Sequence, residues 1–214
     1  DPALPRIVIG AHYDSHHDTP GADDNASGVA GLIELAYLLD AHAPGTVAVE
    51  LVAYSLEEPP YFGGEDMGSY HHAKALADSG VEIRGMLALE MIGYFSDEPG
   101  SQQYPVPLLK AFYPNRGNFI AVVGKLDQPG FVRAVKGAMK GSTPLPVYSI
   151  NAPVSLQGID YSDHRNYWHF GFPAAMITDT AYLRNTAYHE LHDTWDRLDF
   201  NKMGHATLAT FAAV

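Results

Sequence analysis

Several short segments carry side chains of the types that bind metals, and the first is His12-Tyr13-Asp14, which directly follows an apolar, β-branched run. An imidazole can bind a metal through one ring nitrogen, while a nearby carboxylate holds the tautomer and raises the basicity of the ring. We therefore consider His12 a candidate metal ligand and Asp14 its partner. The triplet alone also fits an ordinary polar strand end.

Adjacent carboxylates occur at two further places. Asp23 and Asp24 lie in the glycine-bounded segment 21–28, where helix capping is the simplest role. Such neighbouring charges repel each other unless a cation or hydrogen-bond donors offset the repulsion, and one carboxylate has two oxygens with which to bridge two metals.

Glu57 and Glu58 follow the second long apolar run. Because consecutive strand residues point in opposite directions, one can bind a metal while the other takes a proton from its water. An exposed acidic loop is the alternative.

Glu90 stands inside an otherwise apolar strand-like run, residues 83–92. Glutamate is almost never fully buried without a partner, and no basic residue lies nearby in the sequence. The C-terminal part adds the Ser-Asp-His segment 162–164 and, further on, His189 and His192. Either of these two histidines can complete a metal site, and the residues alone leave the choice open.

The composition narrows the chemistry. The 214 residues include no cysteine, which excludes a disulfide framework, a thiolate zinc site and a cysteine nucleophile. Lys and Arg number 13 against 25 Asp and Glu, a net charge of -12, which argues against nucleic acid or an anionic membrane as partner. No apolar run approaches a membrane span, and nothing at the N-terminus reads as a signal peptide. Imidazoles mixed with carboxylates suit zinc, cobalt or manganese, and two such metals sharing a water form a standard device for hydrolysis.

Strands and helices alternate along the chain and must position these side chains. We predict strands at 6–11, 47–56, 83–92, 118–123, 147–150 and 174–178, and helices from 29 to about 43, over 67–77, from 129 to about 140, and after Asp199. This alternation predicts one α/β domain over residues 1–214, with a mixed, mainly parallel sheet flanked by helices on both faces. Ligands of such sheets bind beyond the carboxyl ends of the strands, where the polar residues above lie.

Six segments occur in an order that is typical of one family: His12-Tyr-Asp-Ser, Gly21-Ala-Asp-Asp-Asn-Ala-Ser-Gly, Glu57-Glu58, Leu89-Glu-Met-Ile, Ser162-Asp-His, and Tyr188-His189 with Asp193-Thr194. In this combination the chain resembles the di-zinc aminopeptidases, a family that also includes glutamate carboxypeptidase, the transferrin receptor ectodomain and the glutaminyl cyclases. The resemblance covers nearly the whole chain. It implies the fold of the zinc-dependent exopeptidases, a three-layer sandwich of the phosphorylase/hydrolase-like type.

The resemblance implies two divalent metal ions, most simply zinc. His12 and Glu90 would bind one, Glu58 and His189 the other, and Asp24 would bridge them. This settles the open choice between the two C-terminal histidines. In the family a cis peptide bond often follows the bridging residue, here Asp24.

Further roles are implied by the same resemblance. Glu57 would be the general base, and Asp14 the partner of the first histidine ligand. Asp163 and His164 would support the site without binding metal. A phenol can help to hold a tetrahedral oxyanion, and Tyr161 is the candidate by its location beside this pair.

The chain departs from the family pattern in two ways. The ligand on the third strand is usually Asp, whereas here it is Glu90, whose longer side chain would shift the metal. The family commonly has strand and helix material before the His-x-Asp strand, and this chain starts close to that strand. The missing edge is expected to be truncated or paired with another chain.

The resemblance slightly favours an extracellular or periplasmic location, and the compartment and the oligomeric state stay open.

We therefore expect an aminopeptidase that hydrolyses N-terminal residues from peptides. One alternative is an acyltransferase of the glutaminyl cyclase kind, although those enzymes typically carry Trp just before the last metal-binding His, where this chain has Ala187-Tyr188. Another is a non-catalytic binding homologue. Such members have lost metal ligands or the catalytic Glu, and this chain retains them.

The other histidines are interpreted as surface or packing residues. His16 and His17 lie on the loop nearest the site, so a role in substrate contact stays open for them. Aromatic candidates for a specificity pocket, each with core packing as the alternative, are Tyr61, Phe62, Tyr94, Phe95 and Trp168.

Overall fold

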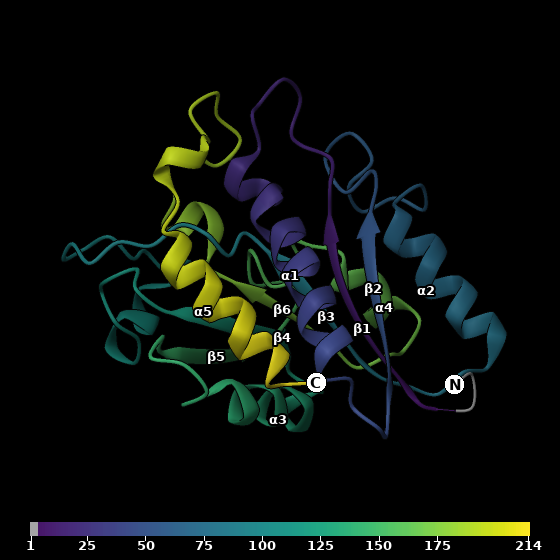
Figure 1. Cartoon of the computed structure of the whole chain (residues 1–214). Coiled ribbons are helices and arrows are strands. Elements are labelled where there is room, and N and C mark those ends of the chain that lie inside the picture. Colours follow the sequence, from purple (N-terminus) through teal and green to yellow (C-terminus); the bar gives the residue numbers. More distant parts are fainter. Residues whose placement is uncertain (1–3) are drawn as a thin grey trace.

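The computed structural model describes residues 4–214, and a six-stranded sheet forms its centre (Figure 1). The strands are β1 (Arg6–His12), β2 (Ala48–Tyr54), β3 (Ile83–Glu90), β4 (Ile120–Lys125), β5 (Val147–Ala152) and β6 (Ala174–Thr178). Their order is β2-β1-β3-β6-β4-β5. Neighbouring strands are parallel except for β4 and β6, which run antiparallel. The predicted mixed, mainly parallel sheet is confirmed.

Helices cover both faces of the sheet. They are α1 (Gly28–Ala41), α2 (Gly68–Ser79), α3 (Pro129–Met139), α4 (His164–His169) and α5 (Phe200–Phe211). Residues of α1, α3 and α5 pack in one hydrophobic cluster, and residues of α2 and α4 pack in another. The predicted three layers are therefore present. Helix α4 was not predicted, because six residues are too few to show a helical period.

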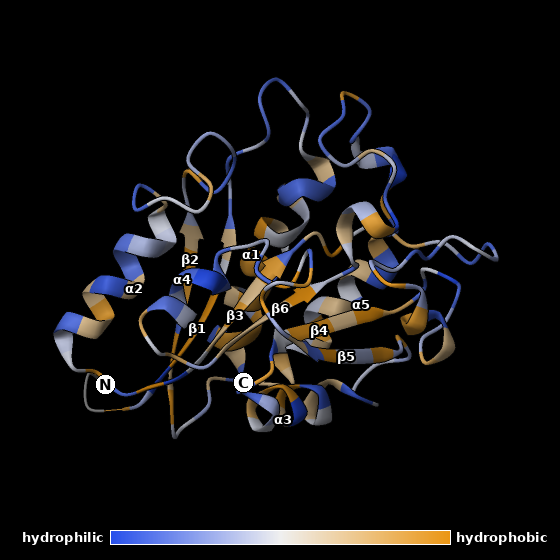
Figure 2. Ribbon diagram, turned by 180° about the vertical axis from the view of Figure 1, so that it is seen from behind, coloured by the Kyte–Doolittle hydropathy of each residue, from blue (hydrophilic) through white to orange (hydrophobic). Residues whose placement is uncertain are grey.

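The central strand β3 explains why the sheet holds these layers together. Leu87 and Leu89 belong to the cluster under α1, α3 and α5, whereas Met86 and Ala88 belong to the cluster under α2 and α4. Successive side chains of a strand point to opposite faces, so a strand covered on both sides is apolar throughout. Figure 2 shows the inner strands β3, β6 and β4 mainly in orange, whereas helix α2 alternates between blue and orange residues.

The carboxyl ends of the strands carry the polar residues that the sequence singled out. His12 is the last residue of β1, and Glu90 is the last residue of β3. Strand β2 ends at Tyr54, so Glu57 and Glu58 lie in the loop beyond it. The prediction that strand alternation separates these two carboxylates was therefore wrong. Their directions are set by the loop, which is described below.

Shorter helical turns occupy the loops at 22–27, 107–111, 181–183 and 195–197. Over residues 4–214 we find no helix with the length and apolar character needed to cross a membrane.

Candidate metal centre

Asp24 lies between two imidazoles from opposite ends of the chain. Its Oδ1 is 3.3 Å from Nε2 of His12, and its Oδ2 is 3.2 Å from Nε2 of His189. The residue is only 4% exposed, so water offers it little alternative. The two oxygens of one buried carboxylate thus face two separate ring nitrogens, which is the arrangement that a bridging ligand requires.

A second carboxylate accompanies each imidazole. Oε2 of Glu90 is 3.4 Å from Nε2 of His12, and Oε2 of Glu58 is 3.2 Å from Nε2 of His189. The ligand atoms of His12, Asp24 and Glu90 all lie within 4.8 Å of one another. The structure therefore brings together the five side chains that the family resemblance implied as metal ligands.

Asp14 organises both Glu57 and Glu58. Its carboxylate accepts the backbone N–H groups of Glu57 at 3.3 Å and of Glu58 at 3.1 Å. The same carboxylate is 3.6 Å from Nδ1 of His12, but the nearer partner of that nitrogen is the backbone carbonyl of Asp14, at 3.1 Å. A carbonyl only accepts, so Nδ1 carries the proton and Nε2 is directed at the carboxylates. Asp14 thus fixes the imidazole tautomer through its main chain and the two glutamates through its side chain.

Asp23 plays a different part from its neighbour Asp24. Its carboxylate accepts from the backbone N–H of Gly93 at 3.0 Å and from Nδ2 of Asn185 at 2.8 Å. The carboxylate of Asp193 accepts the backbone N–H groups of both Asp23 and Asp24 at 3.1 to 3.2 Å. Hydrogen-bond donors therefore stabilise the negative charge of Asp23. The carboxylate of Asp24, in contrast, faces the two imidazoles.

The loop that carries Asp24 is tied to the end of β3. Asn25 donates from Nδ2 to the carbonyl of Leu89 at 2.8 Å and accepts the N–H of Met91 at 3.0 Å. The peptide bond between Asp24 and Asn25 is cis, as the resemblance predicted. Side-chain hydrogen bonds thus hold this loop and the Glu90 strand end in one unit.

The buried atoms of this centre fit a divalent cation. Within residues 4–214 no hydrogen-bond partner reaches Nε2 of His12 or Oε1 of Glu58, and both atoms are shielded from solvent. Buried polar atoms without partners are costly, and carboxylates packed together repel each other. A cation relieves both costs, and imidazole with carboxylate oxygen is a donor set that zinc accepts.

The pKa values of the buried carboxyl groups in this centre shift in different directions. Burial, reinforced by the nearby carboxylate of Glu90, raises the pKa of Glu57 well above its usual range. Burial also raises the pKa of Glu90 to about 7. At Asp24 burial acts in the same direction, but the two imidazoles prevail and lower the pKa to about 2. The centre therefore keeps Asp24 ionised and makes Glu57 a group that readily takes up a proton.

The remaining predicted residues lie in different surroundings. Ser162 donates from Oγ to Oε2 of Glu90 at 2.7 Å. Asp163 and His164 are fully buried, and burial raises the pKa of Asp163 to about 6 and lowers that of His164 to about 4. Tyr161 is 40% exposed and lies at the wall of the neighbouring pocket. His192, the histidine left aside by the resemblance, is exposed.

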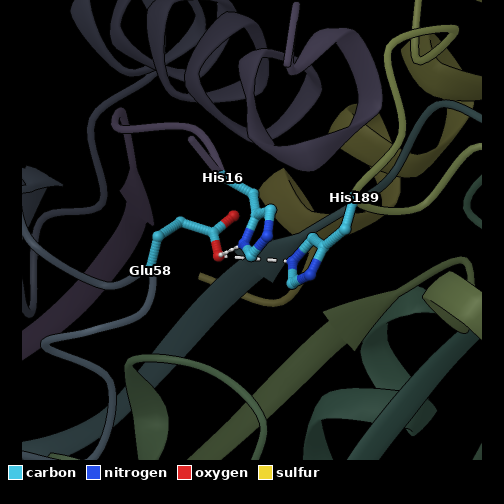
Figure 3. A group of neighbouring side chains, drawn as sticks. All are labelled: His16, Glu58 and His189. Carbon is cyan, nitrogen blue, oxygen red and sulfur yellow. Dashed lines mark ion pairs between the residues drawn. The ribbon is translucent and has the colours of Figure 1, made fainter. Parts of the chain in front are cut away.

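His16 is a member of the centre that the sequence did not assign. Its Nδ1 is 3.5 Å from Oε2 of Glu58, and its ring stacks on that of His189 (Figure 3). Its place on the loop after β1 was the only signal in the sequence, and that signal does not distinguish it from His17.

An apolar pocket adjoins the centre at Glu90. It encloses about 850 Å³ including its open mouth. Its wall includes Tyr104, Tyr113, Phe119, Tyr148, Ile150 and Met176. In the described part of the chain none of the five aromatic candidates lines this pocket, and a role for any of them in substrate contact stays a prediction. Phe95, in the loop after β3, and Trp168, on α4, pack in the hydrophobic core, which was the alternative for each candidate.

A family model described as peptidase family M28 matches residues 2–214. The chain belongs to peptidase family M28. It is 54% identical over 207 residues to a protein of Escherichia coli K12 named uncharacterized protein YfbL, covering 93% of this chain and 63% of the relative. It is 27% identical over 210 residues to leucine aminopeptidase 1 of Uncinocarpus reesii, covering 92% of this chain and 47% of the relative. The chain thus spans about half to two thirds of the length of these curated relatives.

Solved structures share the M28 fold. The LapA aminopeptidase of Legionella pneumophila superposes with a TM-score of 0.74 at 22% identity, over 100% of this chain and 52% of that chain. A zinc aminopeptidase of Bacillus subtilis gives 0.71 at 21% identity, over 99% and 45%. A glutaminyl cyclase of Bacteroides thetaiotaomicron gives 0.68 at 18% identity, over 99% and 73%. Membership of the M28 family and the shared α/β fold are consistent with the predicted resemblance.

Proposed function

We propose that this chain is the catalytic domain of a two-metal aminopeptidase that removes N-terminal residues from peptides, with Glu57 as general base. The observation that carries the proposal is Asp24, whose two carboxylate oxygens face His12 and His189 at 3.3 and 3.2 Å. A single metal would need only one of these faces. Membership of a peptidase family, with leucine aminopeptidases among the relatives, supports the choice of reaction.

The metal ligands in this proposal follow the contacts. His12 and Glu90 would hold one ion, Glu58 and His189 would hold the second, and Asp24 would be shared. Zinc is the favoured ion because it accepts mixed imidazole and carboxylate ligands. When bound, the pair supplies Lewis-acid polarisation of the scissile carbonyl and lowers the pKa of an attacking water toward neutrality.

Glu57 moves the proton in this scheme. Its Oε2 is 3.9 Å from Nε2 of His12, and the side chain is almost wholly buried. Burial raises its pKa well above the usual range, which brings the group closer to the working pH of a general base. Glu57 takes a proton from the attacking water and passes it to the departing amine. Asp14 positions Glu57 for this transfer through the backbone N–H.

The pocket beside Glu90 is suited to the side chain of the first residue. Its wall is formed mainly by apolar and aromatic groups, among them Phe119, Ile150 and Met176. Burial of an apolar side chain there is favourable by about 25 cal/mol per Å² removed from water. A large apolar N-terminal residue is therefore the preferred substrate. Tyr161 belongs to the same wall, which supports the proposal that its hydroxyl donates to a tetrahedral oxyanion.

The test is hydrolysis of leucyl-arylamide compared with its N-acetylated form, in metal-loaded protein and after chelation. We expect turnover of the free amine only, and loss of turnover with the chelator. Equal cleavage of the acetylated form would overturn the exopeptidase assignment. Cyclisation of a peptide with N-terminal Gln, without hydrolysis, would favour the glutaminyl cyclase alternative instead.

A further inference from the structure

His16 occupies an unexpected place in the centre. Its ring lies parallel to that of His189, with centroids 3.9 Å apart and planes 8° apart. The two rings approach the same oxygen, Oε2 of Glu58: Nδ1 of His16 is 3.5 Å from it, and Nε2 of His189 is 3.2 Å from it. Figure 3 shows both imidazoles on one side of the carboxylate, with a nitrogen of each directed at it.

Stacking alone does not explain the direction of this nitrogen. The side chain of His16 is 21% exposed, yet its Nδ1 is shielded from solvent and has no hydrogen-bond partner among residues 4–214. The facing residue, Glu58, is itself more than nine-tenths buried, and its Oε1 also lacks a partner. An imidazole that merely covered its neighbour would gain by turning this nitrogen to water. A buried ring nitrogen without a partner, directed at a carboxylate oxygen that a second imidazole also approaches, indicates a shared ligand.

The main chain around His16 is held by local bonds. Its carbonyl accepts from the N–H of Thr19 at 3.0 Å and from the Oγ1 of the same residue at 2.7 Å. The turn therefore presents the side chain in one direction. His17, the next residue, is exposed and contacts His16 only edge to face, so it offers a matched control.

We propose that His16 is an additional ligand, through Nδ1, of the metal held by Glu58 and His189. This inference rests on the two-metal site proposed above. The ligand atoms of these three residues lie within 4.8 Å of one another, the separation expected around one ion. With the shared Asp24, this ion has four protein ligands.

The consequence is an asymmetric pair of sites. Zinc with three protein ligands keeps an open position for water or substrate, whereas zinc with four reaches water or substrate only by expanding to five-coordinate. The ion held by His12, Glu90 and Asp24 has three and stays open. The ion with His16 has four and is the tighter and less exchangeable one.

The test is stepwise metal binding to metal-depleted protein, followed by competition with a chromogenic chelator for Zn²⁺ and by visible absorption for Co²⁺. Wild type is expected to show two sites of unequal affinity. His16→Ala is expected to weaken the tighter site at least about 10-fold, since loss of even an indirect partner of a ligand costs about 10–100-fold. The Co²⁺ spectrum should change for that site alone, and added imidazole should restore it. His17→Ala should bind both metals as wild type does.

The outcomes separate the two claims. If wild type binds two ions and His16→Ala has unchanged affinities and spectrum, the His16 assignment is overturned while the two-metal site stands. If wild type binds fewer than two ions, the proposed two-metal function fails and the His16 assignment with it. A rise in KM for a leucyl-arylamide without any change in metal binding would make His16 a substrate contact and also overturn the assignment. His16→Gln, which keeps a polar side chain, repeats the test if the Ala variant fails to fold.

Discussion

Glu57 and Glu58 are neighbours in the sequence, yet their carboxylates approach different imidazoles. Oε2 of Glu57 is 3.9 Å from Nε2 of His12, whereas Oε2 of Glu58 is 3.2 Å from Nε2 of His189. The carboxylate of Asp14 holds the backbone N–H groups of both and so fixes their directions. The pair can therefore divide two tasks, metal binding and proton transfer, between adjacent residues.

Replacing Glu58 tests the first of these tasks. Glu58→Gln removes a negative ligand while keeping the size of the side chain. We expect one of the two metal affinities to fall at least about 10-fold, as for losses of metal-site partners in general. Metal content after dialysis and chelator competition measure the change. Wild-type affinities for both ions would show that Glu58 is not a ligand.

Ser162 gives a prediction about the other metal. Its hydroxyl donates to Glu90 at 2.7 Å, so Ser162→Ala leaves that oxygen without a donor and free to turn. We expect the affinity of one ion to fall by about 10–100-fold, with little change in the unfolding of metal-free protein. The control is Ser142→Ala, a serine whose hydroxyl instead donates to the carbonyl of Met139 at the end of α3. Equal effects of the two substitutions on metal binding would contradict a specific role for Ser162.

The pocket predicts the substrate preference. A leucyl-arylamide should exceed the alanyl analogue in kcat/KM by at least about 10-fold, because each added methylene in an apolar pocket contributes a factor of about 10–200. Ile150→Trp adds bulk to the wall of the pocket. It should lower kcat/KM for the leucyl substrate more than for the alanyl substrate and so reduce the ratio of the two values. An unchanged ratio in the variant would place the first side chain elsewhere.

His164 predicts how the stability of the fold depends on pH. Burial lowers the pKa of His164 to about 4, so the folded protein keeps this imidazole neutral where the unfolded chain, with a pKa near 6.5, takes up a proton. The free energy of unfolding should therefore fall as the pH drops from about 6.5 toward 4, by on the order of 3 kcal/mol from this residue. Unfolding of metal-free protein by urea at several pH values measures it.

His164→Gln provides the comparison for this pH dependence. Glutamine can retain a donor to the carbonyl of Ile159, which His164 contacts at 2.8 Å, but it does not titrate. The variant should lose less stability than wild type over the same pH interval. Parallel curves for the two proteins would mean that His164 does not titrate differently in the folded and unfolded states.

Much of the fold could be predicted from the sequence, because its strands are nearly continuous apolar runs. The run containing Leu87 and Leu89 needs both faces covered, and it forms the central strand β3. The antiparallel pairing of β4 with β6 could not be predicted, since strand direction depends on how distant segments cross. Helix α4 was missed because its six residues present no repeat of the helical period.

The candidate site could be predicted in part for a related reason. His12 and Glu90 end parallel neighbours in one sheet, so their approach follows from the topology. The place of His189 depends on a loop about 100 residues further on, and only the family resemblance chose it. His16 stayed unassigned because its contact with Glu58 arises from tertiary packing between two loops. The same holds for the pocket, whose wall comes from several separate segments.

The central claim is tested most directly by measuring kcat for a leucyl-arylamide with the metal-loaded Glu57→Gln variant, together with the metal content of that variant. Gln keeps the shape of Glu57 but cannot accept the proton of the attacking water. The account predicts two bound ions, as in wild type, and a kcat reduced by about 10²–10⁴-fold, the usual contribution of a general base. Wild-type kcat with both ions bound would contradict the assignment of Glu57, and with it the proposed mechanism.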